Sequence, residues 1–370
     1  MTDETQEQQI TAVGNEMSAS FLAAKKRSDE ILAAIEKNPG KFTMLTGDRP
    51  TGRLHLGHYF GSIRERVAMQ NRGVNSNIII ADYQVITDRD TTANIADNVR
   101  NMVVDYLACG IDPEKTIIFT HSAVPALNQL MLPFLSLVTE AELLRNPTVK
   151  AEQDASGHAL TGLLLTYPVH QACDILFCKG NIVPVGKDQE QHLELTRVFA
   201  RRFNNMYGVE YFPESQPYNF GADLVKIPGL DGTGKMGKSE NNGIFLADSD
   251  EAIRKKVMRA VTDSGPTEPD SPLSEGVANI FTIMQAVSAP DTVAFFREQY
   301  ARCEIRYGDL KKQLAEDIIK AIAPIRERIE AIKGDEAYLR RVVSEGAEKA
   351  RASASQTVAD VREIMGIRPF

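Results

Sequence analysis

Short apolar segments alternate with helical patterns between residues 41 and 250, and the clearest is Asn75–Ala81, which holds three isoleucines in a row. A strand that is apolar at consecutive positions is buried on both faces, as in a parallel sheet with helices on each side. Comparable segments lie at Phe42–Thr46, Thr116–Thr120 and Asn181–Val185. The helices expected around them are His55–Gln70, Asn94–Leu107, Val124–Leu144, Gly157–Cys178 and Gln189–Asn204. This alternation predicts a Rossmann-like α/β domain whose ligands bind at the carboxyl ends of the strands.

The pattern changes near residue 250, because every apolar periodicity beyond that point is helical. The helical segments are Glu251–Val261, Ser274–Ser288, Thr292–Tyr300, Tyr307–Ile332 and Asp335–Met365. We therefore predict an α/β domain over residues 41–250 and an all-helical domain over residues 251–370. Residues 1–40 form an N-terminal extension, which we expect to be disordered at first and then helical until Asn38-Pro39-Gly40.

Composition excludes several classes of protein. Apolar residues make up 43% of the chain, which is too many for a disordered protein. The apolar runs are far shorter than the ~20 residues of a membrane span, and the N-terminus is acidic, so we expect a cytoplasmic protein without a signal peptide or membrane contact. The net charge of −8 disfavours a nonspecific nucleic-acid binder but allows a local, specific contact. The four cysteines show no metal-ligand pattern, so we expect reduced, buried thiols and neither zinc nor an iron–sulfur cluster.

The segment Pro50–His58 has the features of a nucleotide site at the point where the first strand passes into the first helix. Backbone N–H groups at a helix start, together with the helix dipole, bind phosphate. Gly57 lets a flat group stack on the backbone, and His55 and His58 are spaced so that both can point to one place. Two alternatives remain, namely histidines that pack the helix start and histidines that bind a metal, although no nearby cysteine or third histidine supports a metal.

A second segment, Gly232–Ser239, matches the phosphate-binding pattern G-x-x-x-x-G-K-S. A P-loop needs a buried strand directly before it and a helix directly after it. Here Pro228-Gly229 interrupts the preceding apolar segment, and Glu240–Gly243 has the composition of a turn. We therefore predict a mobile loop that brings Lys235 and Lys238 to phosphates as charge develops on them, with a P-loop NTPase as the alternative.

Together the two segments resemble the signatures of class I aminoacyl-tRNA synthetases. His55-Leu56-Gly57-His58 is similar to the first signature and Lys235–Ser239 to the second, with Gly237 where the family usually has serine. The resemblance extends from about Thr46 to Val261 and over the helical C-terminal region. Three further stretches are similar to bacterial tryptophanyl-tRNA synthetases, namely Gly47–Gly52, Tyr167–Asp174 and Val185–Arg197.

The resemblance implies a reaction and a set of residue roles. Members of this family activate L-tryptophan with ATP, whose phosphates carry Mg²⁺, and then transfer tryptophan from the adenylate to tRNA(Trp). The residues implied for tryptophan are Leu45, Tyr167, Gln171, Asp174 and Gln189, with Asp174 accepting the indole N–H. Those implied for ATP are Arg49, Pro50, Thr51, Gly57, His58, Gly186, Lys187, Asp188, Lys226, Lys235, Met236, Gly237, Lys238 and Ser239. The implied catalytic residues are His55, His58, Lys235 and Lys238, of which the lysines neutralise charge on the leaving pyrophosphate.

The resemblance also implies assembly and tRNA contact. The family is usually a homodimer, with its interface in helices inserted at about residues 122–165. The helical domain over residues 251–370 is expected to contact the tRNA anticodon. A small basic cluster could serve that contact or be a solvated helix face, and it consists of Arg254, Lys255, Lys256 and Arg259.

One related enzyme competes with this interpretation. Archaeal and eukaryotic tyrosyl-tRNA synthetases have a Tyr, Gln and Asp spaced like Tyr167, Gln171 and Asp174. They usually add a tyrosine on the first strand, whereas Phe42–Leu45 contains none. The stretch Gly186–Arg197 also fits the tryptophan enzyme better. The tryptophan enzyme is therefore the first prediction and the tyrosine enzyme the second.

Gln84 departs from the family pattern, because many members have histidine there, and this departure affects how the pocket contacts its substrate.

Overall fold

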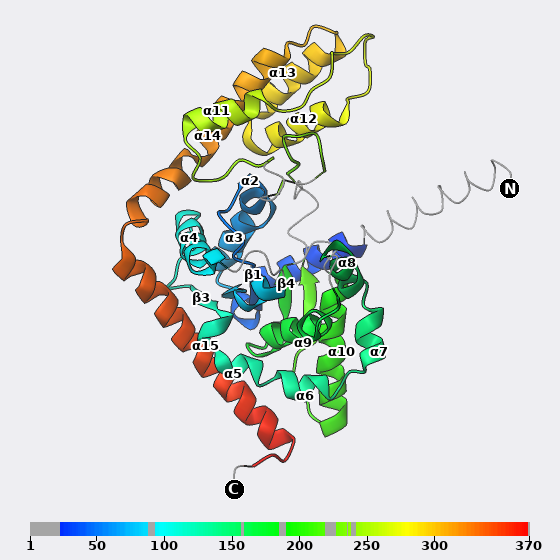
Figure 1. Cartoon of the computed structure of the whole chain (residues 1–370), viewed down its shortest axis with the longest axis vertical. Coiled ribbons are helices and arrows are strands. Elements are labelled where there is room, and N and C mark those ends of the chain that lie inside the picture. Colours follow the sequence, from blue (N-terminus) through cyan, green and yellow to red (C-terminus); the bar gives the residue numbers. More distant parts are fainter. Residues whose placement is uncertain are drawn as a thin grey trace, which may run out of the picture.

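A computed structural model describes residues 23–87, 93–156, 159–184, 190–218, 227–234, 236–237 and 242–368 (Figure 1). Its centre is a sheet of five strands, all paired in parallel, in the order β3-β2-β1-β4-β5. The strands are β1 (Thr43–Asp48), β2 (Asn75–Ile80), β3 (Thr116–Thr120), β4 (Ile182–Pro184) and β5 (Gln216–Tyr218). The Rossmann-like fold predicted from the sequence is confirmed. The sequence did not indicate β5, because three residues with a central proline give no readable periodicity.

The helices before residue 250 cover both faces of this sheet. They are α2 (Leu56–His58), α3 (Arg64–Arg72), α4 (Ile95–Ala108), α5 (Pro125–Asn128), α6 (Met131–Leu135), α7 (Glu140–Arg145), α8 (Pro147–Ser156), α9 (Gly162–Leu176) and α10 (Glu190–Tyr207). Short turns of other helix types are η1 (Pro39–Lys41), η2 (Tyr59–Ile63), η3 (Tyr83–Thr87) and η5 (His121–Ala123). Residues 23–37 are helical as well.

The single helix expected over Val124–Leu144 is wrong, because α5, α6 and α7 divide that segment. A new helix starts at α7, where the Thr139 hydroxyl accepts the N–H of Glu142 and the Glu142 carboxylate accepts the N–H of Thr139. Such a capping box fixes a helix start and thereby ends the preceding run. By contrast, α9 is continuous through Pro168.

The apolar run of β2 is buried on both faces, as its sequence predicted. Ile78 and Ile80 belong to a core that also contains residues of α4, whereas Ile79 belongs to a second core with residues of α9 and α10. The sheet is therefore the middle layer of three, with its carboxyl ends left accessible between the helical layers.

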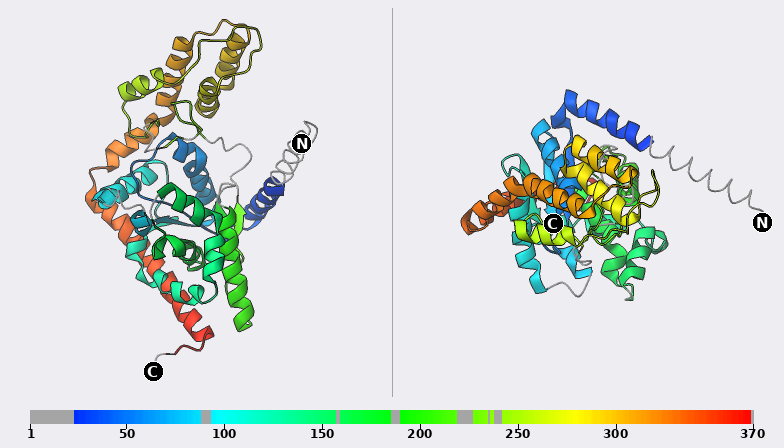
Figure 2. Two further views of the ribbon diagram at one scale, coloured as in Figure 1. Left: turned by 45° about the vertical axis from the view of Figure 1, so that its right-hand side comes forward. Right: turned by 90° about the horizontal axis from the view of Figure 1, so that it is seen from above.

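The described residues after Ser249 are helical or irregular, as expected. The helices are α11 (Asp250–Met258), α12 (Glu275–Val287), α13 (Pro290–Ala301), α14 (Tyr307–Ile332) and α15 (Glu336–Ile364). Helices α11 to α13 lie together at one end of the molecule, and α14 leads from them to α15, which descends along the edge strand β3 (Figures 1 and 2). Gly346 permits this close approach, because a Cβ there would lie 2.0 Å from the carbonyl oxygen of Ile118. The edge strand is therefore covered.

The remaining helix packs beside the opposite half of the sheet. Ile35 from the helical residues 23–37 shares a small apolar core with Met44, Ile182 and Tyr218 of the strands. Within the described part of the chain, no helix is both long and apolar enough to cross a membrane.

Candidate active site

A cavity of about 380 Å³ opens at the carboxyl ends of the central strands. Strand ends and the start of the following loops supply one side of it, and α9 supplies the other. The lining residues are Leu45, Thr46, Gly47, Asp48, Arg49, Arg66, Ile79, Ala81, Gln84, Glu152, Tyr167, Gln171, Asp174, Ile175, Val183 and Pro184. In open α/β sheets, ligands bind at this edge.

Three of the predicted tryptophan-site residues come from α9. Tyr167, Gln171 and Asp174 all line the cavity. Their spacing of four and three residues places them on one side of a helix, since a helical turn takes 3.6 residues. Leu45 of β1 and Arg49 after β1, which the sequence also singled out, line the same cavity.

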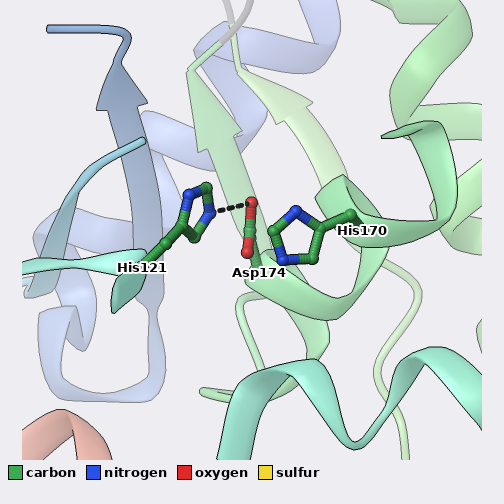
Figure 3. Close-up of side chains that lie close together, drawn as sticks. All are labelled: His121, His170 and Asp174. Atoms are coloured by element: carbon green, nitrogen blue, oxygen red, sulfur yellow. Dashed lines mark hydrogen bonds and ion pairs between the residues drawn. The ribbon is translucent and has the colours of Figure 1, made fainter. Parts of the chain in front are cut away.

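Asp174 is a buried acceptor at this site. Its side chain is 5% exposed, and its Oδ2 lies 2.9 Å from Nε2 of His121, which directly follows β3 (Figure 3). Its Oδ1 is buried and has no hydrogen-bond partner among the described residues. A buried carboxylate oxygen without a donor costs free energy, so the site favours a ligand that brings an N–H or O–H group.

The second buried histidine beside Asp174 is His170, one turn earlier on α9. Its ring centroid lies 4.6 Å from that of His121, and its Nε2 lies 2.7 Å from Oδ1 of Asn128. His121, His170 and Asp174 each offer a possible metal-ligand atom within 4.8 Å of the others. The hydrogen bonds to Asp174 and Asn128 already engage one nitrogen of each ring, which is the geometry of a hydrogen-bonded cluster.

The two histidines have opposite pKa shifts. Burial alone would lower the pKa of His121, but the charge and hydrogen bond of Asp174, with the charge of Asp82, outweigh it and raise that pKa above its usual value. Burial lowers the pKa of His170, and the charge of Asp174 does not compensate. The ring bonded to Asp174 is therefore the one that holds a proton more readily.

An ion pair at the end of β1 forms part of the cavity wall. Arg66 of α3 donates to Oδ2 of Asp48 at 2.7 Å, and the Tyr106 hydroxyl donates to the same oxygen at 2.5 Å. Burial would raise the pKa of Asp48, but the charge and hydrogen bond of Arg66 hold it well below the usual range. Arg66 and Asp48 both line the cavity, so this wall carries one positive and one negative charge that compensate each other.

The first signature forms the start of α2 and does not line the cavity. The His55 ring accepts the N–H of Gly57 at 3.1 Å, and Nδ1 of His58 accepts the N–H of His55 at 3.2 Å. Arg53 holds this loop to α4 through a hydrogen bond of 3.0 Å to the buried Asp105. In this geometry both histidines cap the helix start, which is the packing role that the sequence left open.

The two signatures meet in space. A Cβ on Gly57 would lie 3.7 Å from the Cβ of Met236, and the Met236 side chain is buried. Backbone bonds join the flanking segments, from Leu56 N–H to Ile244 at 3.0 Å and from Leu246 N–H to Leu54 at 3.0 Å. Within the described stretches 227–234 and 242–249, the chain forms turns and loop, so neither side of the second signature has the P-loop context.

Several predicted residues lie outside the described part of the chain. They are Gly186, Lys187, Asp188, Gln189, Lys226, Lys235, Lys238 and Ser239. Pro50 and Thr51 lie in the described loop between β1 and α2, and Gly237 donates its N–H to Oδ1 of Asn242 at 2.9 Å.

Two members of the basic cluster are engaged in ion pairs, Arg254 with Glu316 at 2.7 Å and Lys256 with Asp248 at 2.6 Å. Cys109 and Cys173 are buried, whereas Cys178 is half-buried and Cys303 is exposed, so the expectation of four buried thiols is wrong.

Sequence reasoning missed His121, Arg66 and Glu152. His121 had a readable signal, because it stands directly after a predicted strand, where side chains converge on the ligand edge of a parallel sheet. Arg66 and Glu152 line the cavity from within helices whose sequence pattern does not distinguish them from surface charges.

The chain is similar to known proteins over most of its length. A family described as tRNA synthetases class I (W and Y) matches residues 37–323. The chain belongs to this family. The tryptophan–tRNA ligase of Porphyromonas gingivalis is 50% identical over 326 residues, which cover 88% of this chain and 99% of that protein.

Solved structures agree with the sequence comparison. The tryptophanyl-tRNA synthetase of Campylobacter jejuni, in a complex with ADP and tryptophan, has a TM-score of 0.76 and 30% identity and covers 88% of this chain and 100% of its own. A tyrosyl-tRNA synthetase of Archaeoglobus fulgidus has a TM-score of 0.60 and 20% identity, covering 82% of this chain and 94% of its own. That second likeness shows the shared fold alone.

Proposed function

We propose that this class I synthetase is a tryptophan–tRNA ligase. The observation that carries the proposal is a cavity with an apolar wall and a buried carboxylate, Asp174, whose Oδ1 has no partner among the described residues. The indole of tryptophan combines a large flat apolar ring with one N–H donor. Phenylalanine would leave the acceptor unpaired, which makes such a site strongly selective. Two relatives named tryptophan–tRNA ligase, 50% and 42% identical to this chain, support the same substrate.

The polar end of the cavity suits the backbone of an amino acid. Tyr167 lines it two turns before Asp174 on α9 and Gln171 one turn before, so they would hold the amino and carboxylate groups together with Gln189. Leu45, 4% exposed, would pack against the indole. In this arrangement the substrate carboxylate would point toward Arg49, which lines the same cavity.

ATP would bind along the adjoining edge. Arg49, Pro50 and Thr51 precede the start of α2, where Gly57 and His58 would line the phosphate site. The N–H groups of Gly57 and His58 are bonded to the ring and the carbonyl oxygen of His55, so phosphate would have to replace these bonds or contact other atoms of the two residues. Adenine and ribose would contact Gly186, Lys187 and Asp188, which follow β4 in the sequence, and Lys226, which follows β5 in the sequence. The second signature would close over the phosphates through Lys235, Met236, Gly237, Lys238 and Ser239.

The reaction then needs positioning and charge stabilisation. A carboxylate oxygen of tryptophan attacks the α-phosphorus in line, an O–P bond forms, and the bond to the bridging oxygen of pyrophosphate breaks. Lys235 and Lys238 would neutralise charge on the leaving pyrophosphate, with His55 and His58 holding the helix start; Mg²⁺ carried by the phosphates supplies further positive charge. A ribose hydroxyl at the tRNA end then attacks the adenylate carbonyl, and AMP leaves.

Assembly and tRNA binding complete the proposal. The helical region after residue 250 would contact the tRNA anticodon, with Lys255 and Arg259 exposed on or just after α11. We propose a homodimer in the cytoplasm, with its interface in residues 122–165. Leu132 of α6 supports this interface, because it is apolar and 76% exposed.

The test is amino-acid-dependent exchange of pyrophosphate into ATP with tryptophan, tyrosine or neither. We expect exchange with tryptophan only, and a loss of about 100-fold or more in Lys238→Ala, because one group that stabilises developing charge is removed. Lys320→Ala, a matched change on the exposed side of α14, should exchange like the unaltered protein. Exchange with tyrosine only would support the same mechanism but identify tyrosine as the substrate. ATP hydrolysis without an amino acid would favour a P-loop NTPase.

A further inference from the structure

His121 is a buried residue for which the proposed reaction gives no role. It stands in η5 after β3, and its side chain is fully buried. Asp174 and His170 face it from α9, and Tyr83 from η3 stacks on its ring, with the planes 11° apart and the centroids 6.2 Å apart. Asp82, next to Tyr83, accepts the backbone N–H of Ser122 at 3.1 Å and so holds the turn that carries His121.

The hydrogen bond from His121 makes the two oxygens of Asp174 different, because Oδ2 is bonded to His121 and Oδ1 is not. An ionised carboxylate only accepts hydrogen bonds, so Nε2 of His121 carries the hydrogen toward Oδ2. This leaves Oδ1 as the acceptor without a partner among the described residues, on a side chain that lines the cavity. The terminal torsion of an aspartate is broad, so without His121 the carboxylate could turn either oxygen away from a ligand.

We propose that His121 is a positioning residue that sets specificity, by holding Oδ2 of Asp174 so that Oδ1 is aimed at a ring N–H of the amino acid in the cavity. The inference rests on the proposed function, because it concerns the oxygen assigned there to the indole. The pair selects flat aromatic amino acids that carry a ring N–H donor. An analogue with sulfur in place of that N–H gains nothing from the alignment.

The experiment compares two amino acids in pyrophosphate exchange, tryptophan and its benzothiophene analogue, in which sulfur replaces the indole N–H. We expect His121→Ala to raise KM for tryptophan about tenfold or more, the usual loss for a hydrogen bond to a charged group, and to change KM for the analogue little. His121→Gln keeps a side-chain N–H donor and should recover most of the tryptophan KM. It also serves where the alanine variant folds poorly.

Two further variants separate the possible outcomes. His170→Gln alters the neighbouring ring, which is bonded to Asn128 instead of Asp174, so it should shift KM for both amino acids by the same factor. An equal rise for both amino acids in His121→Ala, without rescue by glutamine, would overturn the positioning role and leave the tryptophan ligase intact. Unchanged discrimination in Asp174→Ala would overturn the assignment of the indole acceptor itself.

Discussion

Two buried histidines on α9 and η5 lie in one cluster and have pKa values that move in opposite directions. Asp174 raises the pKa of His121 against the effect of burial, whereas burial prevails for His170. His121 therefore contributes stability that is fully present below its unfolded pKa and is lost as pH rises through its folded pKa. His170 contributes stability that is present above its unfolded pKa and is lost as pH falls through its folded pKa.

This contrast gives a prediction for titration by NMR. In the ligand-free protein, we expect one histidine to titrate above pH 6.5 and to disappear from the spectrum of His121→Gln, and another to titrate below pH 6.5 and to disappear from that of His170→Gln. The stability difference between the unaltered protein and His121→Gln should shrink as pH rises above about 6.5 and through the raised pKa of His121. Two histidines that titrate together near 6.5 would contradict the electrostatic account of this cluster.

The residues of the cavity show how far sequence reasoning reaches at this scale. Tyr167, Gln171 and Asp174 were expected from the resemblance of the stretch Tyr167–Asp174 to the family, and α9 carries all three. His121 was missed because its partner lies 53 residues away on another element, and only the sheet topology brings them together. A side chain's partner across a fold is not encoded in local spacing, so the pair became visible only in three dimensions.

The elements follow local patterns where those patterns are long. Helix α14 has the bounds that the sequence predicted, Tyr307–Ile332, and β3 does as well, Thr116–Thr120. The segment over residues 124–144 was mispredicted because its apolar content gives one periodicity while turns and a capping box divide it. Short elements such as β5 depend on neighbouring strands more than on their own three residues.

The contact between α15 and β3 gives a prediction at the scale of elements. Gly346→Ala places a Cβ 2.0 Å from the carbonyl oxygen of Ile118, and backbone cannot yield as a flexible side chain does. We expect a loss of about 1–3 kcal/mol in unfolding free energy, measured by urea denaturation. Gly308→Ala in α14 is the matched control, since nothing lies within 4 Å of its Cβ, and it should gain up to about 1 kcal/mol from helix propensity. Equal effects in both variants would refute the close packing.

The whole molecule joins its sheet and its C-terminal helices through shared cores. One apolar core contains Ile78 of β2 together with Phe281 of α12 and Ile318 of α14. The other contains Phe119 of β3 together with Ala350 of α15. Arg328 of α14 also donates a hydrogen bond to the carbonyl oxygen of Ala108 at the end of α4. The α/β region and the helical region that we propose on either side of residue 250 therefore share a continuous apolar interior.

This continuity predicts how the protein unfolds. Two regions that share their cores cannot melt separately without exposing apolar surface of both, so we expect one calorimetric transition for the full chain, with equal calorimetric and van't Hoff enthalpies if it is reversible. Removing residues 336–370 should lower the melting temperature of the rest and expose β3 as an apolar sheet edge, which predicts aggregation during expression. Two separate transitions, or a soluble truncated chain that melts at the same temperature, would show that the helical region is an independent unit. In that case α15 would serve tRNA contact and not the stability of the active-site sheet.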